Sequence, residues 1–198
     1  MTKNRLKFSV YDMSIVGVMA AVVFVVTYFI RIEIPTPAGP VMFKLANAFC
    51  LLAGTLFGGL RGGLAAGIGS MFFDLFDPKY ITDAPFTLIR FFLMAFICGM
   101  ICFSNGRNGK NLMWNIIGTT SGALFSVVFY FAQSIIKQLI LGQPFSVAIV
   151  NIIPKISTSL INAVLAVVVA CILTPVLHAA LERAGVYNKL MLLRRKEA

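Results

Sequence analysis

Four ionisable side chains lie inside long apolar stretches of this 198-residue sequence: Lys44, Asp74, Arg90 and Lys155. A charge in membrane hydrocarbon is costly unless it faces a partner or a water-filled cavity. Ammonium and guanidinium groups can bind carboxylates, phosphates and carbonyl oxygens through charge-assisted hydrogen bonds. Because all four charges fall toward the same side of the membrane once the helices are oriented, we predict a polar pocket that opens on one face.

The apolar stretches that carry these charges are typical of a helical membrane protein. Hydrophobic residues make up 59% of the chain, which excludes an ordinary soluble domain. Only helices and closed barrels satisfy their backbone in lipid, and these runs lack the alternation of a barrel strand. We therefore expect one all-α integral membrane domain over residues 1–198, a six-transmembrane-helix bundle. Its expected spans are residues 13–30, 41–57, 64–76, 86–103, 112–136 and 146–177.

Positive charges are distributed unevenly between the two sides of this expected bundle. One side receives eleven Lys and Arg residues, from the N-terminus, the second and fourth loops and the tail, whereas the other receives three: Arg31, Lys79 and Lys137. Cytoplasmic segments of membrane proteins carry the excess of Lys and Arg, so we expect both termini to be cytoplasmic. Because topology already requires these cations, the net charge of +10 does not indicate a nucleic-acid partner.

Further polar residues surround the four embedded charges. At about 1.5 Å per helical residue, Lys44 and Asn47 fall one turn apart near the outer end of the second span, and Thr87 and Arg90 repeat this spacing on the fourth. Spacings of four, three and four place a polar stripe on one face of the sixth span: Asn151, Lys155, Thr158 and Asn162. The predicted substrate-binding residues are Lys44, Asn47, Asp74, Tyr80, Asp83, Thr87, Arg90, Gln133, Asn151, Lys155, Thr158 and Asn162.

Several of these residues also have an interpretation without a ligand. Lys44 could extend its side chain to the outer membrane interface, and Arg90 could form a structural ion pair with Asp74. Asn151 and Asn162 could hydrogen-bond neighbouring helices, as polar side chains commonly do in membrane bundles. The clustering of polar groups at one depth, from five of the six spans, favours a binding pocket over these separate roles.

Small residues mark a different part of the expected bundle. Gly17 and Ala21 stand four residues apart on the first span, which has no ionisable residue after Asp12. Such a step lets two helices approach closely. We therefore predict that Gly17 and Ala21 contact another membrane protein.

Some function classes lack the residues that they need. The sequence has no Gly-x-x-x-x-Gly-Lys-Ser/Thr loop, so the chain itself is not expected to hydrolyse ATP. It has a single histidine, His178, and no glutamate inside the expected spans, which leaves no metalloprotease or paired-carboxylate site. We expect neither an enzyme nor a bound cofactor or metal.

Several segments resemble those of a known transporter family. They are Ile34-Pro-Thr-Pro37, Phe43-Lys-Leu-Ala-Asn-Ala-Phe-Cys-Leu-Leu-Ala-Gly54, Gly62-Gly-Leu-Ala-Ala-Gly-Ile-Gly-Ser70 with Asp74, and Ala84-Pro-Phe-Thr-Leu-Ile89. The chain resembles, over nearly its whole length, the substrate-binding S components of energy-coupling factor (ECF) transporters, and most of all their riboflavin-transporter-like branch. It departs from them at Ala46-Asn47, where relatives often have Gly-Asp or Gly-Asn, and at Arg90, where relatives commonly carry Lys or Phe-Lys. Because that branch holds several specificities, the resemblance does not fix the substrate.

The resemblance implies a six-helix protein of the bacterial plasma membrane that captures a water-soluble vitamin at its extracellular end. It also implies that the first span, here through Gly17 and Ala21, meets a transmembrane coupling subunit driven by two cytoplasmic ATPases. The implied function is a high-affinity binding subunit of an ATP-driven importer, with riboflavin among the candidate cargoes. The alternative is a stand-alone ion-coupled secondary transporter of a small polar metabolite. Two observations argue against that alternative: no inverted repeat is visible, and the spans contain few acidic residues suited to ion coupling.

The embedded charges also bear on the ligand. Three cations, Lys44, Arg90 and Lys155, outnumber the one embedded acid, Asp74. We therefore expect a ligand that presents hydrogen-bond acceptors or a negative group, such as a carboxylate, a phosphate or ring carbonyls.

The orientation predicts which loops a membrane-impermeant reagent can reach. A cysteine introduced at Asp83 or Gln143 should react with an impermeant thiol reagent added to intact cells, whereas one at Asn108 should react only after the cells are opened. The parent chain, whose four cysteines lie in apolar runs, is the control. The reverse labelling pattern would contradict the orientation and every depth assigned from it.

Overall fold

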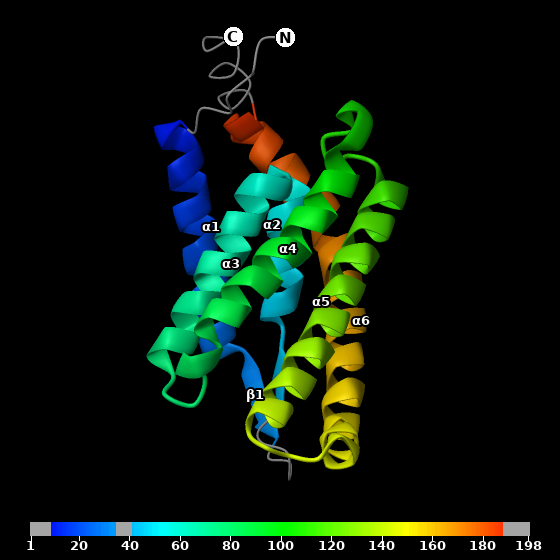
Figure 1. The fold of residues 1–198 in the computed structure, drawn as a ribbon. Helices are drawn as coiled ribbons and strands as arrows, with labels where there is room; N and C mark the ends of the chain where they lie inside the picture. Colours follow the sequence, from blue (N-terminus) through cyan, green and yellow to red (C-terminus); the bar gives the residue numbers. More distant parts are fainter. Residues whose placement is uncertain (1–8, 35–40, 188–198) are drawn as a thin grey trace, which may run out of the picture.

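The computed structural model describes residues 9–34 and 41–187, and it forms the expected all-α bundle with a short hairpin at one end (Figure 1). The hairpin pairs β1 (Arg31–Ile34) with β2 (Val41–Lys44) in antiparallel fashion, with Arg31 opposite Lys44. Two short 3-10 turns, η1 (Ile81–Asp83) and η2 (Ser104–Gly106), lie in the connections. The helices are α1 (Val10–Phe29), α2 (Ala46–Phe57), α3 (Gly59–Phe76), α4 (Ala84–Phe103), α5 (Leu112–Ile140) and α6 (Phe145–Arg183).

By length and composition, four segments are apolar enough to cross a membrane: Val10–Phe29, Ile81–Gly106, Leu112–Ile140 and Lys155–Arg183. The other two expected spans differ. α2 has 12 residues, about 18 Å of helix, which is shorter than the hydrocarbon core of about 30 Å. α3 has 18 residues but contains several glycines and Arg61. The structure thus supports a multi-pass helical protein in which the six helices differ greatly in length.

Two predicted boundaries are wrong. The expected second span, 41–57, is divided, because residues 41–44 form a strand and α2 begins only at Ala46. Lys44 therefore lies on β2, not one helical turn from Asn47. The expected turn over residues 58–63 is a single residue, Gly58, whose φ of 82° is accessible to glycine at little cost. Helix α3 starts directly after it, at Gly59.

Side chains at the helix ends explain where several helices start. The Ser9 N–H donates to the Asp12 carboxylate in a capping box at the start of α1, and Asp12 also pairs with Arg61 of α3 at 2.7 Å. At the start of α5, the Asn111 side chain accepts from the backbone N–H groups of Met113 and Trp114. These contacts satisfy backbone donors that have no partner within the helix.

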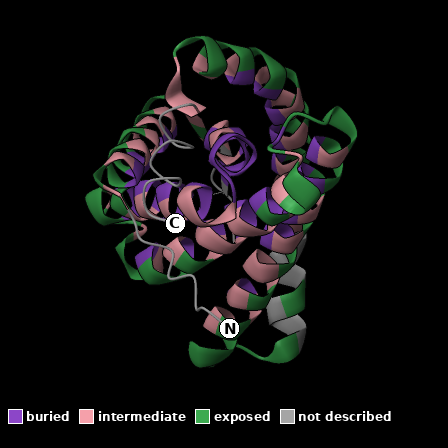
Figure 2. Cartoon of the chain, turned by 90° about the horizontal axis from the view of Figure 1, so that it is seen from above, coloured by how far each residue is buried: buried purple, intermediate pink, exposed green. Residues whose placement is uncertain are grey.

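Helix α2 lies in the middle of the bundle, against α3, α4 and α6. Ten of its residues are buried, and the view along the bundle shows buried positions toward the centre and exposed ones on the outer faces (Figure 2). Leu51, Leu52 and Leu56 of α2 pack with Phe91 and Met94 of α4 in the main hydrophobic cluster. The core is therefore organised around α2.

Glycines allow the neighbours of α2 to approach it backbone against backbone. A Cβ on Gly62 of α3 would lie 2.4 Å from the Ala53 carbonyl oxygen, and a Cβ on Gly54 would lie 2.5 Å from that of Ala95 on α4. Neither contact is possible for a larger residue without a backbone shift, so these glycines fix the position of α2 between α3 and α4.

The end of the bundle away from the hairpin is closed by polar contacts. The Tyr187 hydroxyl donates to the Leu56 carbonyl at the end of α2 (3.1 Å), and the His178 ring lies 3.0 Å from the Asn108 carbonyl oxygen. The buried hydroxyls of Thr55 on α2 and Thr174 on α6 are 3.0 Å apart. These contacts join α2, α6 and the loop before α5.

The close approach at Gly62 predicts a strong effect of one added methyl group. Gly62→Ala should lower the stability of the purified protein by about 1–3 kcal/mol, because its Cβ meets backbone atoms that cannot move alone. Gly17→Ala is the matched control, since no described atom lies within 4 Å of its Cβ. The thermal unfolding midpoint in detergent compares them, and equal midpoints for the two variants would contradict this packing.

Candidate functional site

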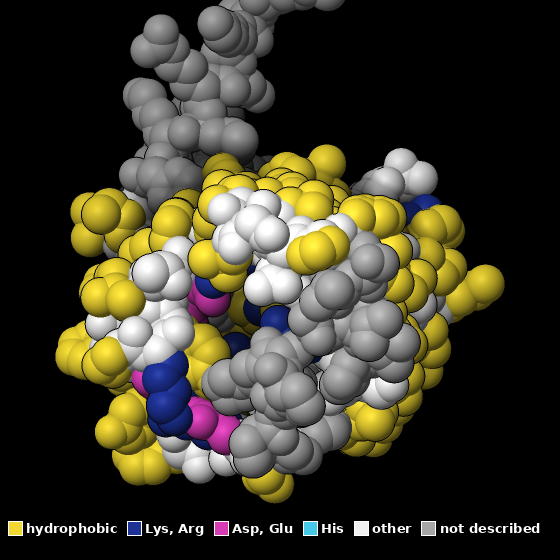
Figure 3. Space-filling model, turned by 60° about the horizontal axis from the view of Figure 1, so that its bottom comes forward, with side chains coloured by type: hydrophobic (Ala, Val, Ile, Leu, Met, Phe, Trp, Pro, Cys, Tyr) yellow, Lys and Arg dark blue, Asp and Glu magenta, His cyan; other side chains and the backbone are white. Residues whose placement is uncertain are grey.

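A cavity of about 630 Å³ lies at the hairpin end of the bundle. Residues of β2, α2, α3, α4, α5 and α6 line it, together with the segment between α3 and α4. The face at this end is hollowed, with Lys and Arg side chains visible inside the hollow (Figure 3). Among the described residues of α1, none lines the cavity.

The cavity brings together the predicted site residues from separate parts of the chain. The side chain of Asn151 lies outside the described residues, and the others all line this cavity. They are Lys44, Asn47, Asp74, Tyr80, Asp83, Thr87, Arg90, Gln133, Lys155, Thr158 and Asn162.

Other lining residues were missed by the sequence reasoning. Helix α5 carries Ser126, Tyr130, Gln133 and Lys137 at spacings of four, three and four, the same spacing as the stripe on α6. Only Gln133 was predicted, although this periodicity indicates one helix face. The remaining missed lining residues are Met42, Lys79, Ser134, Gln138, Leu141 and Ser159.

The embedded cations Lys44 and Arg90 contact aromatic rings. The Arg90 guanidinium carbon lies 4.5 Å from the Phe91 ring centroid and 4.9 Å from that of Tyr130. The Lys44 ammonium nitrogen lies 5.6 Å from the centroid of the same Phe91 ring. Among the described residues, no carboxylate oxygen lies within 4.0 Å of Arg90, so the alternative of a structural Arg90–Asp74 ion pair is not seen.

Asn162 joins α6 to the hairpin. Its side-chain N–H donates to the Met42 carbonyl at 2.7 Å, and its side-chain oxygen accepts from the Lys44 backbone N–H at 3.2 Å. Both atoms of the amide are thus used to hold the β2 backbone at the cavity wall. This resembles the expected structural role of Asn162, except that its partner is a strand instead of a helix.

Asp83 joins the segment before α4 to α5. It accepts a hydrogen bond from the Gln133 amide at 3.1 Å and pairs with the Lys137 ammonium at 2.5 Å. The three side chains form one contact across the wall of the cavity. Lys137, Asp83 and Gln133 therefore satisfy one another without a ligand.

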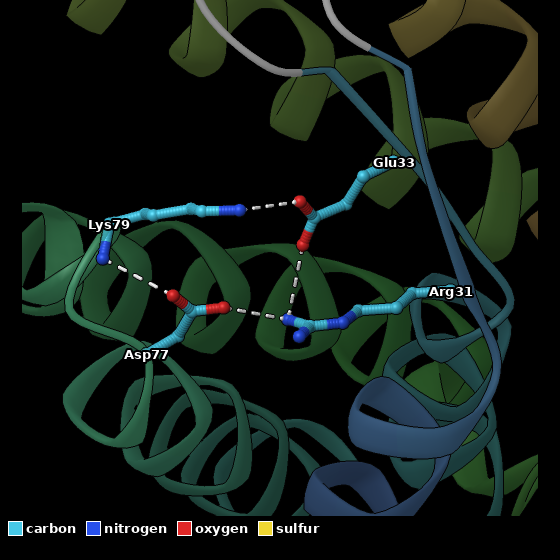
Figure 4. A network of polar contacts seen from close by, with 4 residues as sticks. All are labelled: Arg31, Glu33, Asp77 and Lys79. Atoms are coloured by element: carbon cyan, nitrogen blue, oxygen red, sulfur yellow. Dashed lines mark hydrogen bonds and ion pairs between the residues drawn. The ribbon is translucent and has the colours of Figure 1, made fainter.

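A network of ion pairs links the hairpin to the segment after α3 (Figure 4). Arg31 pairs with Asp77 at 3.0 Å and with Glu33 at 3.5 Å, while Lys79 pairs with Glu33 at 3.1 Å. Single exposed pairs contribute little, about 0–1 kcal/mol, but networks hold their members in place better. This network fixes β1 beside the segment that carries Lys79 and Tyr80 of the cavity wall.

The neighbouring Tyr80 hydroxyl is buried without a hydrogen-bond partner. Burial, followed by the nearby Glu33 and Asp77 carboxylates, raises the pKa of Tyr80 above its usual value. The phenol therefore keeps its proton at neutral pH, and it is available to donate a hydrogen bond.

The chain matches a known protein family over most of its length. Residues 7–179 match the family model for the ECF-type riboflavin transporter, S component. The matched segment includes every described residue that lines the cavity. A comparison with curated proteins finds no match to the chain.

The double hydrogen bond of Asn162 predicts a local effect on the hairpin. Asn162→Ala should speed amide hydrogen exchange over residues 42–44, because Lys44 loses an acceptor and the Met42 carbonyl loses a donor. Ser157→Ala is the control, since Ser157 is exposed on the same helix. Unchanged exchange over residues 42–44 in Asn162→Ala would contradict the role assigned to this side chain.

Proposed function

We propose that the cavity at the hairpin end holds the cargo, because the chain belongs to the ECF-type riboflavin transporter S-component family. An S component is the membrane-embedded substrate-binding subunit of such a transporter. The observation that carries this proposal is the gathering of polar side chains from six elements around one space of about 630 Å³. Ligand sites are commonly concave spaces of this size with a few converging polar groups. Riboflavin, which the family name contains, is the first candidate cargo.

The cavity opens to the outside of the bacterial plasma membrane, and both termini are cytoplasmic. The support for this orientation is the excess of Lys and Arg at the other end of the bundle. Cargo then enters past the hairpin and the segment between α3 and α4. The polar contacts that join α2, α6 and the loop before α5 close the cytoplasmic end.

Helix α1 is the surface that meets a transmembrane coupling subunit, which two cytoplasmic ATPases drive. Gly17 and Ala21 are exposed on this helix, and a Cβ at Gly17 would have open space around it. Small residues allow a partner helix to come close. Because no described residue of α1 lines the cavity, cargo binding and partner binding use different surfaces.

Co-purification and reconstitution test this proposal. The chain should co-purify with a coupling subunit and two ATPases, and proteoliposomes of that complex should accumulate riboflavin or a related vitamin only with ATP. Accumulation by the chain alone on an ion gradient would instead support a secondary transporter and overturn the proposal.

The two surfaces predict opposite effects of variants in this assay. Gly17→Leu or Ala21→Leu should abolish uptake and pull-down of the coupling subunit while cargo binding stays normal. Lys155→Ala should weaken cargo binding about 10- to 100-fold, because it removes a charged group from the cavity wall, while the complex still assembles. Val18→Leu, an exposed neighbour of Gly17 on α1, is the matched control for added bulk. If Gly17→Leu loses cargo binding as strongly as Lys155→Ala, the two surfaces are not separate.

A further inference from the structure

The charges that line the cavity are not balanced. The described lining contains five Lys and Arg side chains and two carboxylates, Asp74 and Asp83. Lys137 is paired with Asp83, and Lys79 is paired with Glu33 of the hairpin. One acid, Asp74, then faces the cations that remain: Lys44, Arg90 and Lys155.

These three cations lack a close carboxylate. Of the carboxylate groups that the structure describes, none has an oxygen within 4.0 Å of Lys44, Arg90 or Lys155. Asp74 is buried, with 4% of its surface exposed, and acts electrostatically on both Lys44 and Arg90. Asp74 is therefore shared between two cations, and the carboxylate that acts on Lys155, Asp83, is already paired with Lys137.

Aromatic rings do not replace the missing negative charge. Phe91 lies beside both cations, 4.5 Å from the Arg90 guanidinium carbon and 5.6 Å from the Lys44 nitrogen. Such contacts contribute through the ring face and do not supply the acceptors that the N–H groups at the edge of a guanidinium need. The Arg90 Nε is buried with no hydrogen-bond partner. The fork of N–H donors on a planar guanidinium fits a carboxylate or a phosphate.

The start of α2 adds to the positive potential at the same place. Asn47, in the first turn of α2, lines the cavity, and Leu45 at the N-cap position makes no side-chain hydrogen bond to the helix. The N-terminus of a helix carries a partial positive charge and free backbone N–H groups. This end therefore favours an anion, as do Lys44 and Arg90 beside it.

We propose that the cargo carries an anionic group, a carboxylate or a phosphate, which binds to Arg90 and Lys44 at the start of α2. This inference rests on the proposed function and narrows its cargo: riboflavin has no anionic group, so a phosphorylated or carboxylated vitamin, such as riboflavin 5′-phosphate, replaces it as the first candidate. Lys155, on the opposing helix α6, contributes the third positive charge. A cargo with one or two negative charges offsets the excess of cations in the cavity.

Anion binding to the purified protein tests this inference directly. The thermal unfolding midpoint is measured with millimolar sodium phosphate or sodium acetate against sodium chloride at equal ionic strength. Riboflavin and riboflavin 5′-phosphate form a second pair of probes that differ only in the phosphate. We expect phosphate or acetate to stabilise the protein more than chloride, and riboflavin 5′-phosphate to bind more tightly than riboflavin.

The variants separate the proposed site from general salt effects. Arg90→Gln should weaken anion binding about 10- to 100-fold, and Lys155→Gln should weaken it in the same direction. Lys110→Gln is the matched control, because Lys110 is likewise paired with a glutamate, Glu182, but does not line the cavity. It should respond to anions as the unaltered protein does.

Two results would overturn the inference. One is an equal response of the unaltered protein and Arg90→Gln to phosphate and acetate, and the other is binding of riboflavin at least as tight as that of its 5′-phosphate. Either result leaves the proposed function intact, because that function is overturned by a different result, accumulation of cargo by the chain alone on an ion gradient. The inorganic anions decide the charge of the site independently of which vitamin is carried.

Discussion

The short length of the central helix is the constraint on which the rest of the structure depends. Helix α2 has 12 residues, whereas α5 has 29 and α6 has 39. Because α2 occupies the middle of the bundle over only about 18 Å, the longer helices enclose space beyond its first residue, Ala46. That space is the cavity. Backbone contact at Gly62 and Gly54 holds α2 in this central position, since a larger residue at either would require a backbone shift.

The same arrangement allows cations to lie deep within the bundle. Lys44 leaves the strand just before α2, and Arg90 projects from α4 at the same level, so both reach the cavity instead of lipid. Phe91 contacts both of them. Asn162 then holds the β2 backbone against α6 through one hydrogen bond to Met42 and one to Lys44. Contacts among its own residues therefore hold the cavity wall together. The described lining contains more Lys and Arg side chains than carboxylates.

The outer wall of the cavity depends on contacts between segments distant in the sequence. Arg31 of the hairpin pairs with Asp77 after α3, and Lys137 of α5 pairs with Asp83 before α4. These pairs hold the hairpin, the segment between α3 and α4, and helix α5 together at the cavity rim. Among the described residues of α1, none lines this wall, and the small residues Gly17 and Ala21 of that helix are exposed.

The sequence by itself determined the helical class and the polar positions, because long apolar runs and the spacing of Asn151, Lys155, Thr158 and Asn162 depend only on local periodicity. Family membership followed from segments that the chain carries in linear order. The sequence did not determine that Lys44 lies on a strand, because a four-residue segment has too little periodicity to separate strand from helix. Nor did it show that Arg90 contacts Phe91 and Tyr130 instead of Asp74. Phe91 follows Arg90 on α4, but Tyr130 comes from α5 and Asp74 from α3, and only the tertiary packing around the short helix α2 decides which of these two lies against Arg90.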